Sequence, residues 1–378
     1  MKKPLPGKYY ECEGKSMPSI SVIMATARDD YPIIGLPQLH MLQPTIESLN
    51  IQSFKDFEFI ICDAIYDRRP NLFHGEPFNM EKLPFQVKHV PVDTKHRFWL
   101  DRKRWNLCGQ LNTGIMHSEG DMIIRIDDCC EFGSDYLMKF WDGYQRGYFP
   151  LAMHIRYLNG KPARVNREYM EKGYEAAGHY RSQTWEHNAD EILKKIYGEN
   201  GLIRDTRYEK VKAAGGTMIA PPDWYYGYSS MSIEAALKVN GFDENFDADK
   251  SLEDPDMGSR LEMAGYKNKF LLDVNHQVIE HEHGPVSQGL FNSNLKPVKC
   301  NYALFLLNRK NRRYRANSGK FAGEDIEFIR QESRKAPCSP DGIPDFYEDD
   351  CKGDAFETWM FRQPVFDLEK ERKRVLEC

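Results

Sequence analysis

Short apolar runs separated by polar turns dominate the first 130 residues. They stand at 19–24, 57–62, 85–90 and 122–126. Because both faces of each run are apolar, the runs predict buried strands of a parallel sheet. Between them, apolar residues at helical spacing predict helices over 42–49 and 107–115. This alternation of strands and helices indicates an α/β fold.

The pattern is more irregular after residue 130. Strands are predicted over 151–157 and 270–274, and helices over 137–144, 233–240, 301–309, 325–335 and 361–376. No element is assigned to 66–84. The polar segment 159–222 is too long for a simple loop in a compact domain, so we expect an insertion that forms a partly helical lid.

The central run ends abruptly in two acids. Asp127 and Asp128 follow the apolar residues 122–126, and Cys129 and Cys130 come next. Ligands bind at the carboxyl edge of open α/β sheets. Two adjacent carboxylates repel each other unless a cation lies between them, and oxygen ligands suit Mg²⁺ or Mn²⁺. The alternative is an acidic surface loop after a strand.

Composition limits the function classes. The 378 residues include 52 Lys and Arg against 57 Asp and Glu, a net charge of −5, so no global positive field points to nucleic acid or an anionic membrane. Nine cysteines without a CxxC pair fit a reducing compartment. Residues 1–18 have no apolar core of a signal peptide, and no run of about 18 apolar residues occurs. We therefore expect a cytoplasmic protein.

Two segments have the chemistry to bind a nucleotide. The first strand runs into Thr26, Ala27 and Arg28, which could bring backbone N–H groups and one guanidinium to a phosphate; an ordinary turn is the alternative. Residues 95–105, with Arg102, mix basic and aromatic side chains that can hold a diphosphate and stack a base; a solvated basic face is the alternative. The chain has neither GxGxxG nor a Walker A motif.

Later segments offer further candidates. The segment 223–232 has four aromatic residues around Gly227, namely Trp224, Tyr225, Tyr226 and Tyr228. They could form an aromatic wall with a gap that suits stacking on a sugar, with Trp224, Tyr226 and Gly227 as the candidate site residues; a core strand with large side chains is the alternative. Acids at 253–256 begin a predicted helix, and the helix dipole alone would explain them. His281 and His283 lie two apart in an extended segment and would point the same way; two surface histidines are the alternative.

The order of these motifs resembles glycosyltransferase family 2. The resemblance covers residues 19–285 and rests on segments that recur in a fixed order. They are the strand segment 52–63, the helix segment 111–115, the turn and strand 118–123, the acid pair Asp127-Asp128, and the helix that begins at Glu253-Asp254 and continues through Arg260-Leu261 to Gly265-Tyr266.

The resemblance implies the GT-A fold, which has a Rossmann-like, mostly parallel central sheet flanked by helices. It also implies a nucleotide-sugar donor, and a divalent cation held by a DxD motif in most members. Thr26, Ala27 and Arg28 would embrace the nucleotide, and Asp63 would hydrogen-bond its base, a uracil in many relatives. The other donor-binding candidates are Arg102, Asn112 and Asp127.

For the metal, either Mn²⁺ or Mg²⁺, the resemblance implies Asp127 and Asp128. Cys129 stands where relatives commonly have the next acid, and a usually protonated thiol is a poor ligand for Mg²⁺. His283 is the preferred histidine ligand and His281 the second choice.

For catalysis, the resemblance implies that Asp254 is the general base of an inverting transfer and that Glu253 orients it. Trp224, Tyr226 and Gly227 would form the sugar or acceptor site. The acceptor could be a glycan, a lipid-linked molecule or a small molecule. Nothing in the sequence fixes its identity, the sugar or the oligomeric state.

We expect a lead-in over 1–18, a catalytic domain over 19–288 and a helical C-terminal extension over 289–378. Residues 19–130 would be the nucleotide-binding half and 131–288 the acceptor half. Two alternatives remain. The basic segments 95–105 and 309–315 allow an enzyme that glycosylates hydroxylated bases in DNA, although the net acidity argues against it. Cys129 allows an inactive protein that only binds nucleotide-sugar.

Overall fold

The computed structural model describes residues 7–10, 18–27, 32–33, 36–40, 42–71, 78, 80–157, 202–205, 207–248, 252–281, 300–335 and 363–377. Two predicted site residues, Arg28 and His283, lie outside these ranges, as does the side chain of His281. Most of the expected lid, from 158 to 201, lies outside them as well.

The predicted strands and helices of the first half are present. The strands are β1 Lys8–Tyr10, β2 Ile20–Thr26, β3 Pro32–Ile33, β4 Leu36–His40, β5 Phe57–Asp63, β6 Gln86–Pro91, β7 Met122–Asp127 and β8 Cys130–Glu131. The helices are α1 Gln43–Asn50, α2 Phe98–Asp101, α3 Leu107–His117 and α4 Tyr136–Gln145, with short 3-10 helices η1 Tyr66–Arg68 and η2 Met80–Lys82. Pro44 stands in the first turn of α1, where its missing N–H costs nothing.

The second half adds strands in both parallel and antiparallel pairs, and the helices that carry the site. Its strands are β9 Phe149–Tyr157, β10 Leu202–Arg204, β11 Thr217–Ile219, β12 Ser229–Ser232 and β13 Phe270–His281. Its helices are α7 Tyr208–Ala213, α8 Ile233–Lys238, α9 Glu253–Met263, α10 Asn301–Lys310, α11 Gly323–Lys335 and α13 Leu368–Leu376, with η3 Pro222–Trp224 and η4 Glu244–Phe246. The side chain of Ser232 accepts a hydrogen bond from the N–H of Ala235, as an N-cap should.

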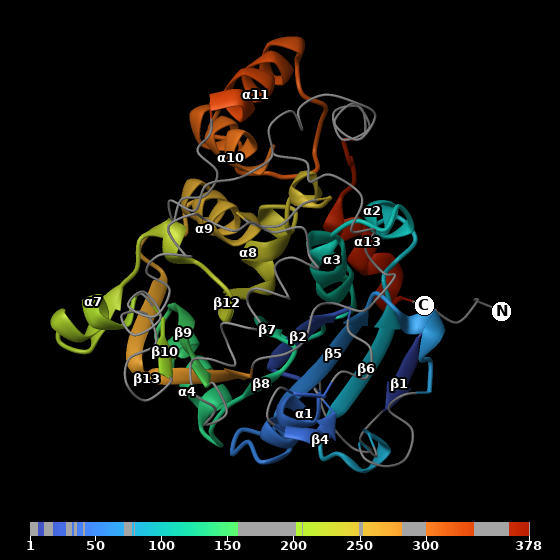
Figure 1. Ribbon diagram of the computed structural model, residues 1–378, viewed down its shortest axis with the longest axis vertical. Helices are drawn as coiled ribbons and strands as arrows, with labels where there is room; N and C mark the ends of the chain where they lie inside the picture. Colours follow the sequence, from blue (N-terminus) through green and yellow to red (C-terminus); the bar gives the residue numbers. More distant parts are fainter. Residues whose placement is uncertain are drawn as a thin grey trace, which may run out of the picture.

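One mixed sheet runs through the molecule in the order β1-β6-β5-β2-β7-β12-β9-β13-β11 (Figure 1). Its central strands β6, β5, β2 and β7 are parallel, and β12 joins β7 antiparallel. Because β2, β5 and β7 are parallel, their carboxyl ends meet at one edge, where Thr26 is in register with Asp63 and Ala25 with Asp127. The α/β, Rossmann-like fold class is confirmed.

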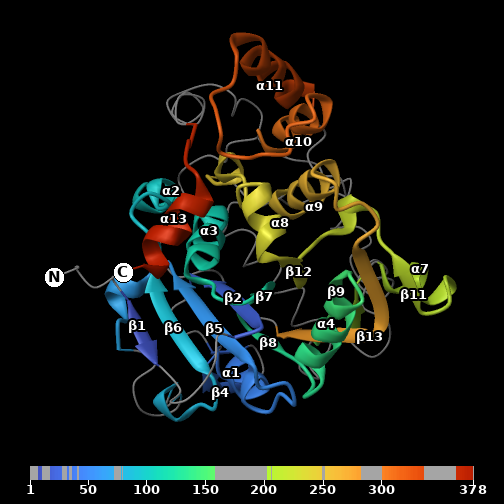
Figure 2. The same ribbon diagram turned by 180° about the vertical axis from the view of Figure 1, so that it is seen from behind.

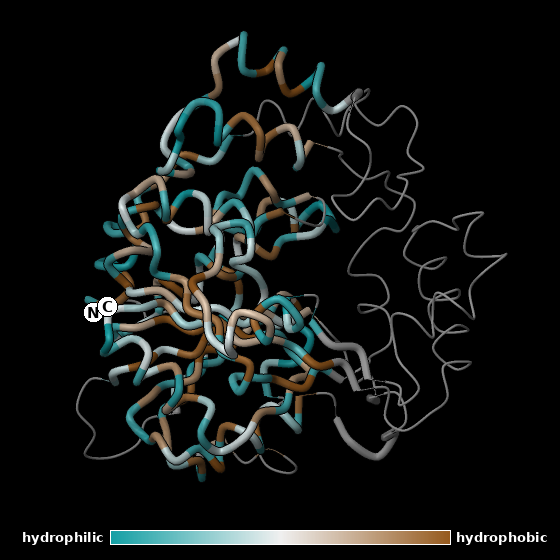
Figure 3. Tube along the Cα trace, turned by 90° about the vertical axis from the view of Figure 1, so that its left-hand side faces the viewer, coloured by the Kyte–Doolittle hydropathy of each residue, from teal (hydrophilic) through white to brown (hydrophobic). Residues whose placement is uncertain are grey.

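Helices cover both faces of the sheet, so its strands are apolar on both sides. Seen from behind in Figure 2, α3, α8, α9 and α13 lie on one side of it and α1 and α4 on the other. Within β2, Ile23 packs into the cluster of the first side, whereas Val22 and Met24 pack into that of the second. Figure 3 shows the resulting concentration of apolar residues along the sheet.

Helices α10 and α11 agree with the predicted helices 301–309 and 325–335, whereas 363–367, part of the predicted helix 361–376, are not helical and α13 begins only at Leu368. Helices α10 and α11 pack on each other and α10 contacts α9, at the top of Figure 1. Helix α13 instead returns to the N-terminal half and packs on α3, where Lys95 pairs with Glu371. Within the described ranges, no helix has the length and apolar character needed to cross a bilayer.

Candidate active site

Asp63, at the end of β5, has four protein donors on its carboxylate. Oδ1 accepts from the N–H of Ile65 at 3.0 Å and from Nη2 of Arg69 at 3.0 Å. Oδ2 accepts from Nε of Arg69 at 2.9 Å and lies 2.9 Å from Nε2 of His89. An ionised carboxylate offers about four acceptor positions. A nucleobase that hydrogen-bonds Asp63 would therefore displace one of these protein groups.

Electrostatics keep Asp63 ionised. Burial alone would raise its pKa, but the hydrogen bonds and charges of His89 and Arg69 lower the pKa below the ordinary value. Burial lowers the pKa of His89 in turn. Arg69 reaches one step further, because its Nη2 lies 3.4 Å from the hydroxyl of Thr26. That hydroxyl donates to Oδ2 of Asp128 at 2.9 Å, so the ends of β2, β5 and β7 are joined by side chains.

Asp254 lies in the first turn of α9, next to the same edge. Leu252, immediately before the helix, has a left-handed backbone with φ of 70°, which turns the chain into the helix. The side chain of Asp254 is only 7% exposed. Its Oδ2 accepts a hydrogen bond from the N–H of Gly227 at 3.0 Å, just before β12 begins. The candidate base is therefore tied to the sheet.

Arg125 on β7 connects Asp254 to the acids of the strand end. Its Nη1 donates to Oδ1 of Asp254, and its Nη2 donates to Oδ1 of Asp127 at 3.1 Å. Burial raises the pKa of Asp254, and the charge of Arg125 and the Gly227 N–H offset that rise only in part. Asp127 is 38% exposed, so it faces solvent more than its partners do.

The donors for a divalent cation do not converge among the residues that the structure describes. No group of three or more His, Cys, Asp or Glu side chains there could hold a metal ion. Cys129 is fully buried in an apolar cluster, with a φ of 63°, which does not favour a role as a ligand. Asp127 is the accessible carboxylate, whereas Asp128 is 6% exposed and bound by Thr26. The described residues alone therefore do not fit a complete cation site.

The predicted aromatic wall divides into two kinds of residue. Tyr225 and Tyr228 are core, whereas Tyr226 is 40% exposed. The guanidinium of Arg207 lies 5.2 Å from the Tyr226 ring centre, and the ammonium of Lys210 lies 5.1 Å from that of Trp224. Gly227 has a φ of 54°, which favours glycine there. Tyr226 therefore stands exposed next to the glycine that binds Asp254.

Three further predicted residues lie in different settings. Arg102 is exposed, with its guanidinium 3.5 Å from the ring centre of Phe98. Asn112 is fully buried and binds the carbonyl of Phe242 at 3.0 Å, so it fastens α3 to the segment before η4. Glu253 is half-buried beside Asp254. The structure thus brings Thr26, Asp63, Asp127, Asp128 and Asp254 to one edge and places Asn112 in the interior.

Sequence reasoning missed three residues that shape this edge, namely Arg69, His89 and Arg125. Arg69 lies in the segment to which no element was assigned. His89 and Arg125 are polar residues inside apolar strands, and that exception to the pattern is the signal that could have found them.

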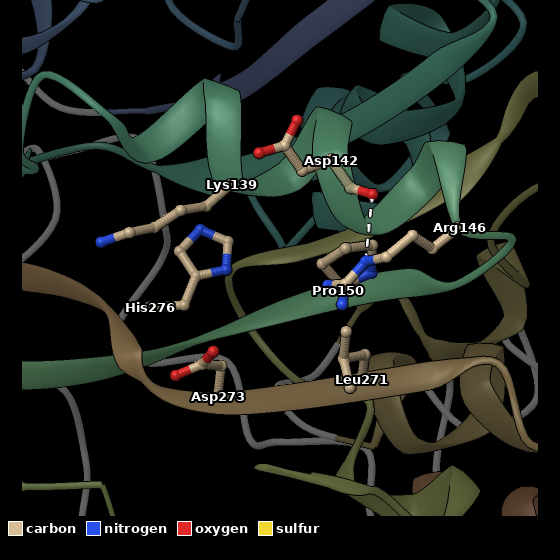
Figure 4. Close-up of a pocket in the computed structure, with 7 residues that line it drawn as sticks. All are labelled: Lys139, Asp142, Arg146, Pro150, Leu271, Asp273 and His276. Atoms are coloured by element: carbon tan, nitrogen blue, oxygen red, sulfur yellow. Dashed lines mark hydrogen bonds between the residues drawn. The ribbon is translucent and has the colours of Figure 1, made fainter. Parts of the chain in front are cut away.

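A small cavity of about 120 Å³ lies elsewhere, between α4 and the strands β9 and β13 (Figure 4). Lys139, Arg146 and His276 line it, with Asp142 and Asp273. Burial lowers the pKa of His276 to about 3, so its ring is neutral at physiological pH. None of the predicted site residues lines this cavity.

Comparisons with known proteins give a distant structural likeness. The chain aligns with S. aureus TarS 1–349 in complex with UDP-GlcNAc at 11% identity, over 83% of this chain and 71% of that one, with a TM-score of 0.41. The alignment with TarS 1–349 without a ligand has 10% identity, covers 83% of this chain and 70% of that one, and has a TM-score of 0.41. The alignment with TarS has 11% identity, covers 83% of this chain and 42% of that one, and has a TM-score of 0.40. No protein-family model and no curated protein sequence matches the chain. A likeness this low supports no argument about function. Any such argument has to come from the geometry of the site.

Proposed function

We propose that the chain is a glycosyltransferase that moves a sugar from a nucleotide-sugar, a UDP-sugar, to an acceptor hydroxyl with inversion. One observation carries the proposal. The candidate base Asp254 and the strand-end acid Asp127 share the guanidinium of Arg125 at the carboxyl edge of the parallel strands. The ordered motifs that resemble glycosyltransferase family 2, from which the role of Asp254 as base is taken, support the same conclusion.

The donor would lie across the ends of β2, β5 and β7, where open α/β sheets bind ligands. Asp63, kept ionised by Arg69 and His89, would accept a hydrogen bond from the base in exchange for one of its protein donors. The exposed carboxylate of Asp127 would lie nearest the diphosphate. With the donor bound in this way, the anomeric carbon would lie on the side of Asp254.

The proposed reaction uses a single buried carboxylate, that of Asp254, as its base. As the acceptor oxygen forms its bond to the anomeric carbon, Asp254 takes the proton of that hydroxyl, and the bond to the diphosphate breaks. A pKa raised by burial makes Asp254 a stronger base than an exposed aspartate. One direct displacement inverts the anomeric configuration. Tyr226, exposed beside Gly227, would stack on the acceptor.

Dependence on Mn²⁺ or Mg²⁺ remains a prediction, and no step above runs through a cation. His283 and the side chain of His281 lie outside the described residues, so the predicted ligand set is only partly placed. Addition of EDTA tests the cation directly.

The experiment is nucleotide release from UDP-, GDP- and dTDP-sugars by the wild-type protein, with Mn²⁺, Mg²⁺ or EDTA. We expect release from UDP-sugars, with a rate that increases when an acceptor is supplied. Tight nucleotide binding without release from any donor, in the presence of a broad acceptor mixture, would contradict the proposal and favour an inactive binding protein.

A further inference from the structure

Arg125 is placed differently from three other arginines whose side chains are largely buried. Arg69, Arg207 and Arg260 pair with aspartates six, two and four residues away. Arg125 joins two acids from different elements, Asp127, two residues along β7, and Asp254, 129 residues away on α9. Its side chain is 6% exposed, and its strand β7 lies between β2 and β12 in the sheet.

We propose that Arg125 is a positioning residue that holds the base Asp254 and the donor-side acid Asp127 in one fixed arrangement. The inference rests on the proposed function, since it gives Arg125 a role in that reaction. Arg125 need not touch either substrate. It acts through the two carboxylates that would.

The charge of Arg125 keeps Asp254 and Asp127 together. Two carboxylates brought to the same edge of the sheet repel each other, and that repulsion would drive Asp254 away from the donor side or protonate it. A single guanidinium between them offsets the repulsion for both. Removing it would leave Asp254 and Asp127 free to separate, so the base would lose its place relative to the anomeric carbon.

The shape of the Arg125 guanidinium also fixes the orientation of Asp254. The guanidinium is planar, with its N–H groups in a rigid fork, so it fixes the directions of both partners. The other oxygen of Asp254 is held by the N–H of Gly227 at 3.0 Å. With one donor on each oxygen, the carboxylate cannot rotate, yet each oxygen keeps a second lone pair that can accept a proton. Asp254 is therefore both oriented and able to react.

Lysine at position 125 could not replace arginine in this role. An ammonium is a point charge on a flexible stem and has no fixed fork. A lysine at 125 would supply the charge but would not set the angle between Asp254 and Asp127. The fold would then tolerate the change better than the reaction would, and this difference makes the inference testable.

The experiment compares Arg125→Lys with the wild-type protein in the nucleotide-release assay. We expect kcat to fall roughly 100-fold while the KM for the donor changes less than about threefold, because a small misplacement of a reacting group costs that much. Arg260→Lys is the matched control. It alters a buried arginine that pairs with Asp256 on the same helix, so it loosens α9 without touching Asp254, and kcat per folded molecule should stay within about threefold of wild type.

Chemical rescue separates a positioning role from a loss of structure. In Arg125→Ala, millimolar guanidinium should restore part of kcat and ammonium should not. If Arg125→Lys does not fold, Arg125→Gln replaces it, since its neutral amide carries no charge to offset the two carboxylates, and the same loss is expected. Near-wild-type kcat in a folded variant, or rescue by both ions alike, would overturn the inference. A wild-type protein that releases no nucleotide would instead contradict the proposed function.

Discussion

Asp254 and Asp256 stand two residues apart on α9, and both pair with a buried arginine, yet they serve different ends. Asp254 reaches Arg125 on the central sheet, which it shares with Asp127. Asp256 pairs within its own helix with Arg260 and accepts from Asn308 of α10 at 2.9 Å. Burial raises the pKa of each aspartate.

The difference between the two pairs lies in what each one connects. Residues two apart on a helix point to nearly opposite sides. Asp256 therefore faces away from the ligand edge of the sheet, and its partners Arg260 of α9 and Asn308 of α10 hold the fold together. Asp254 faces the ligand edge of the sheet, where its neighbour Asp127 is exposed to solvent. A buried ion pair by itself thus identifies no active site; its connection to an accessible strand end does.

The largest effect on stability should come from Asp256→Asn. This change leaves the buried guanidinium of Arg260 without its carboxylate, and breaking such a pair costs about 3–5 kcal/mol of unfolding free energy. Urea unfolding measures the loss. Glu262→Gln, on a less buried position of α9, is the control and should change stability by less than about 0.5 kcal/mol. A decrease in unfolding free energy of less than about 1 kcal/mol in Asp256→Asn would contradict a structural role for Asp256.

Asp63→Asn should give a smaller, mixed effect. Asp63 resembles Asp256 in that protein groups fill its acceptor positions, but it lies at the ligand edge like Asp254. We expect a loss of about 2 kcal/mol in stability, because charged hydrogen bonds are weakened. We also expect the KM for the donor to rise about tenfold with little change in kcat. An unchanged donor KM would place Asp63 with Asp256 as a purely structural residue.

The smallest effect expected is on the pH dependence of kcat. Asp254 must be ionised to accept a proton, so kcat should fall as the pH drops through its pKa. Because burial raises that pKa, the midpoint should lie above the ordinary value of 3.8. The acidic limb should be the same in the folded fraction of Asp256→Asn, since Asp256 does not react. If the acidic limb shifts in Asp256→Asn, the assignment of this titration to Asp254 is wrong.

Much of the fold was predictable, because apolar runs such as 57–62 and 122–126 are long enough to mark buried strands without knowledge of their neighbours. Asp63 and Asp127, predicted at the ends of these strands, do lie at the same edge of the sheet. The sequence pattern missed the edge strand β1, whose three residues are too short to show a period. Part of the expected aromatic wall, Tyr225 and Tyr228, became core, an alternative that composition alone could not exclude.

The site was less predictable because its contacts join distant parts of the chain. Arg125 and Asp254 are 129 residues apart, and His89 and Asp63 are 26 apart, so no local spacing indicates that they meet. Asn112 shows the opposite error. It sits on a helix that the motif order places in the donor half, but the side chain faces the interior and binds the segment before η4. Side-chain direction decides such cases, and the sequence pattern does not give it for a helix buried all round.

The most direct test of the central claim is a side-by-side measurement of Asp254→Asn and Asp256→Asn, with nucleotide release and donor affinity determined per folded molecule. If Asp254 is the base, Asp254→Asn should bind the donor as wild type does and lose at least about 100-fold in kcat, whereas Asp256→Asn should keep its kcat. An Asp254→Asn protein that retains wild-type turnover would contradict the account.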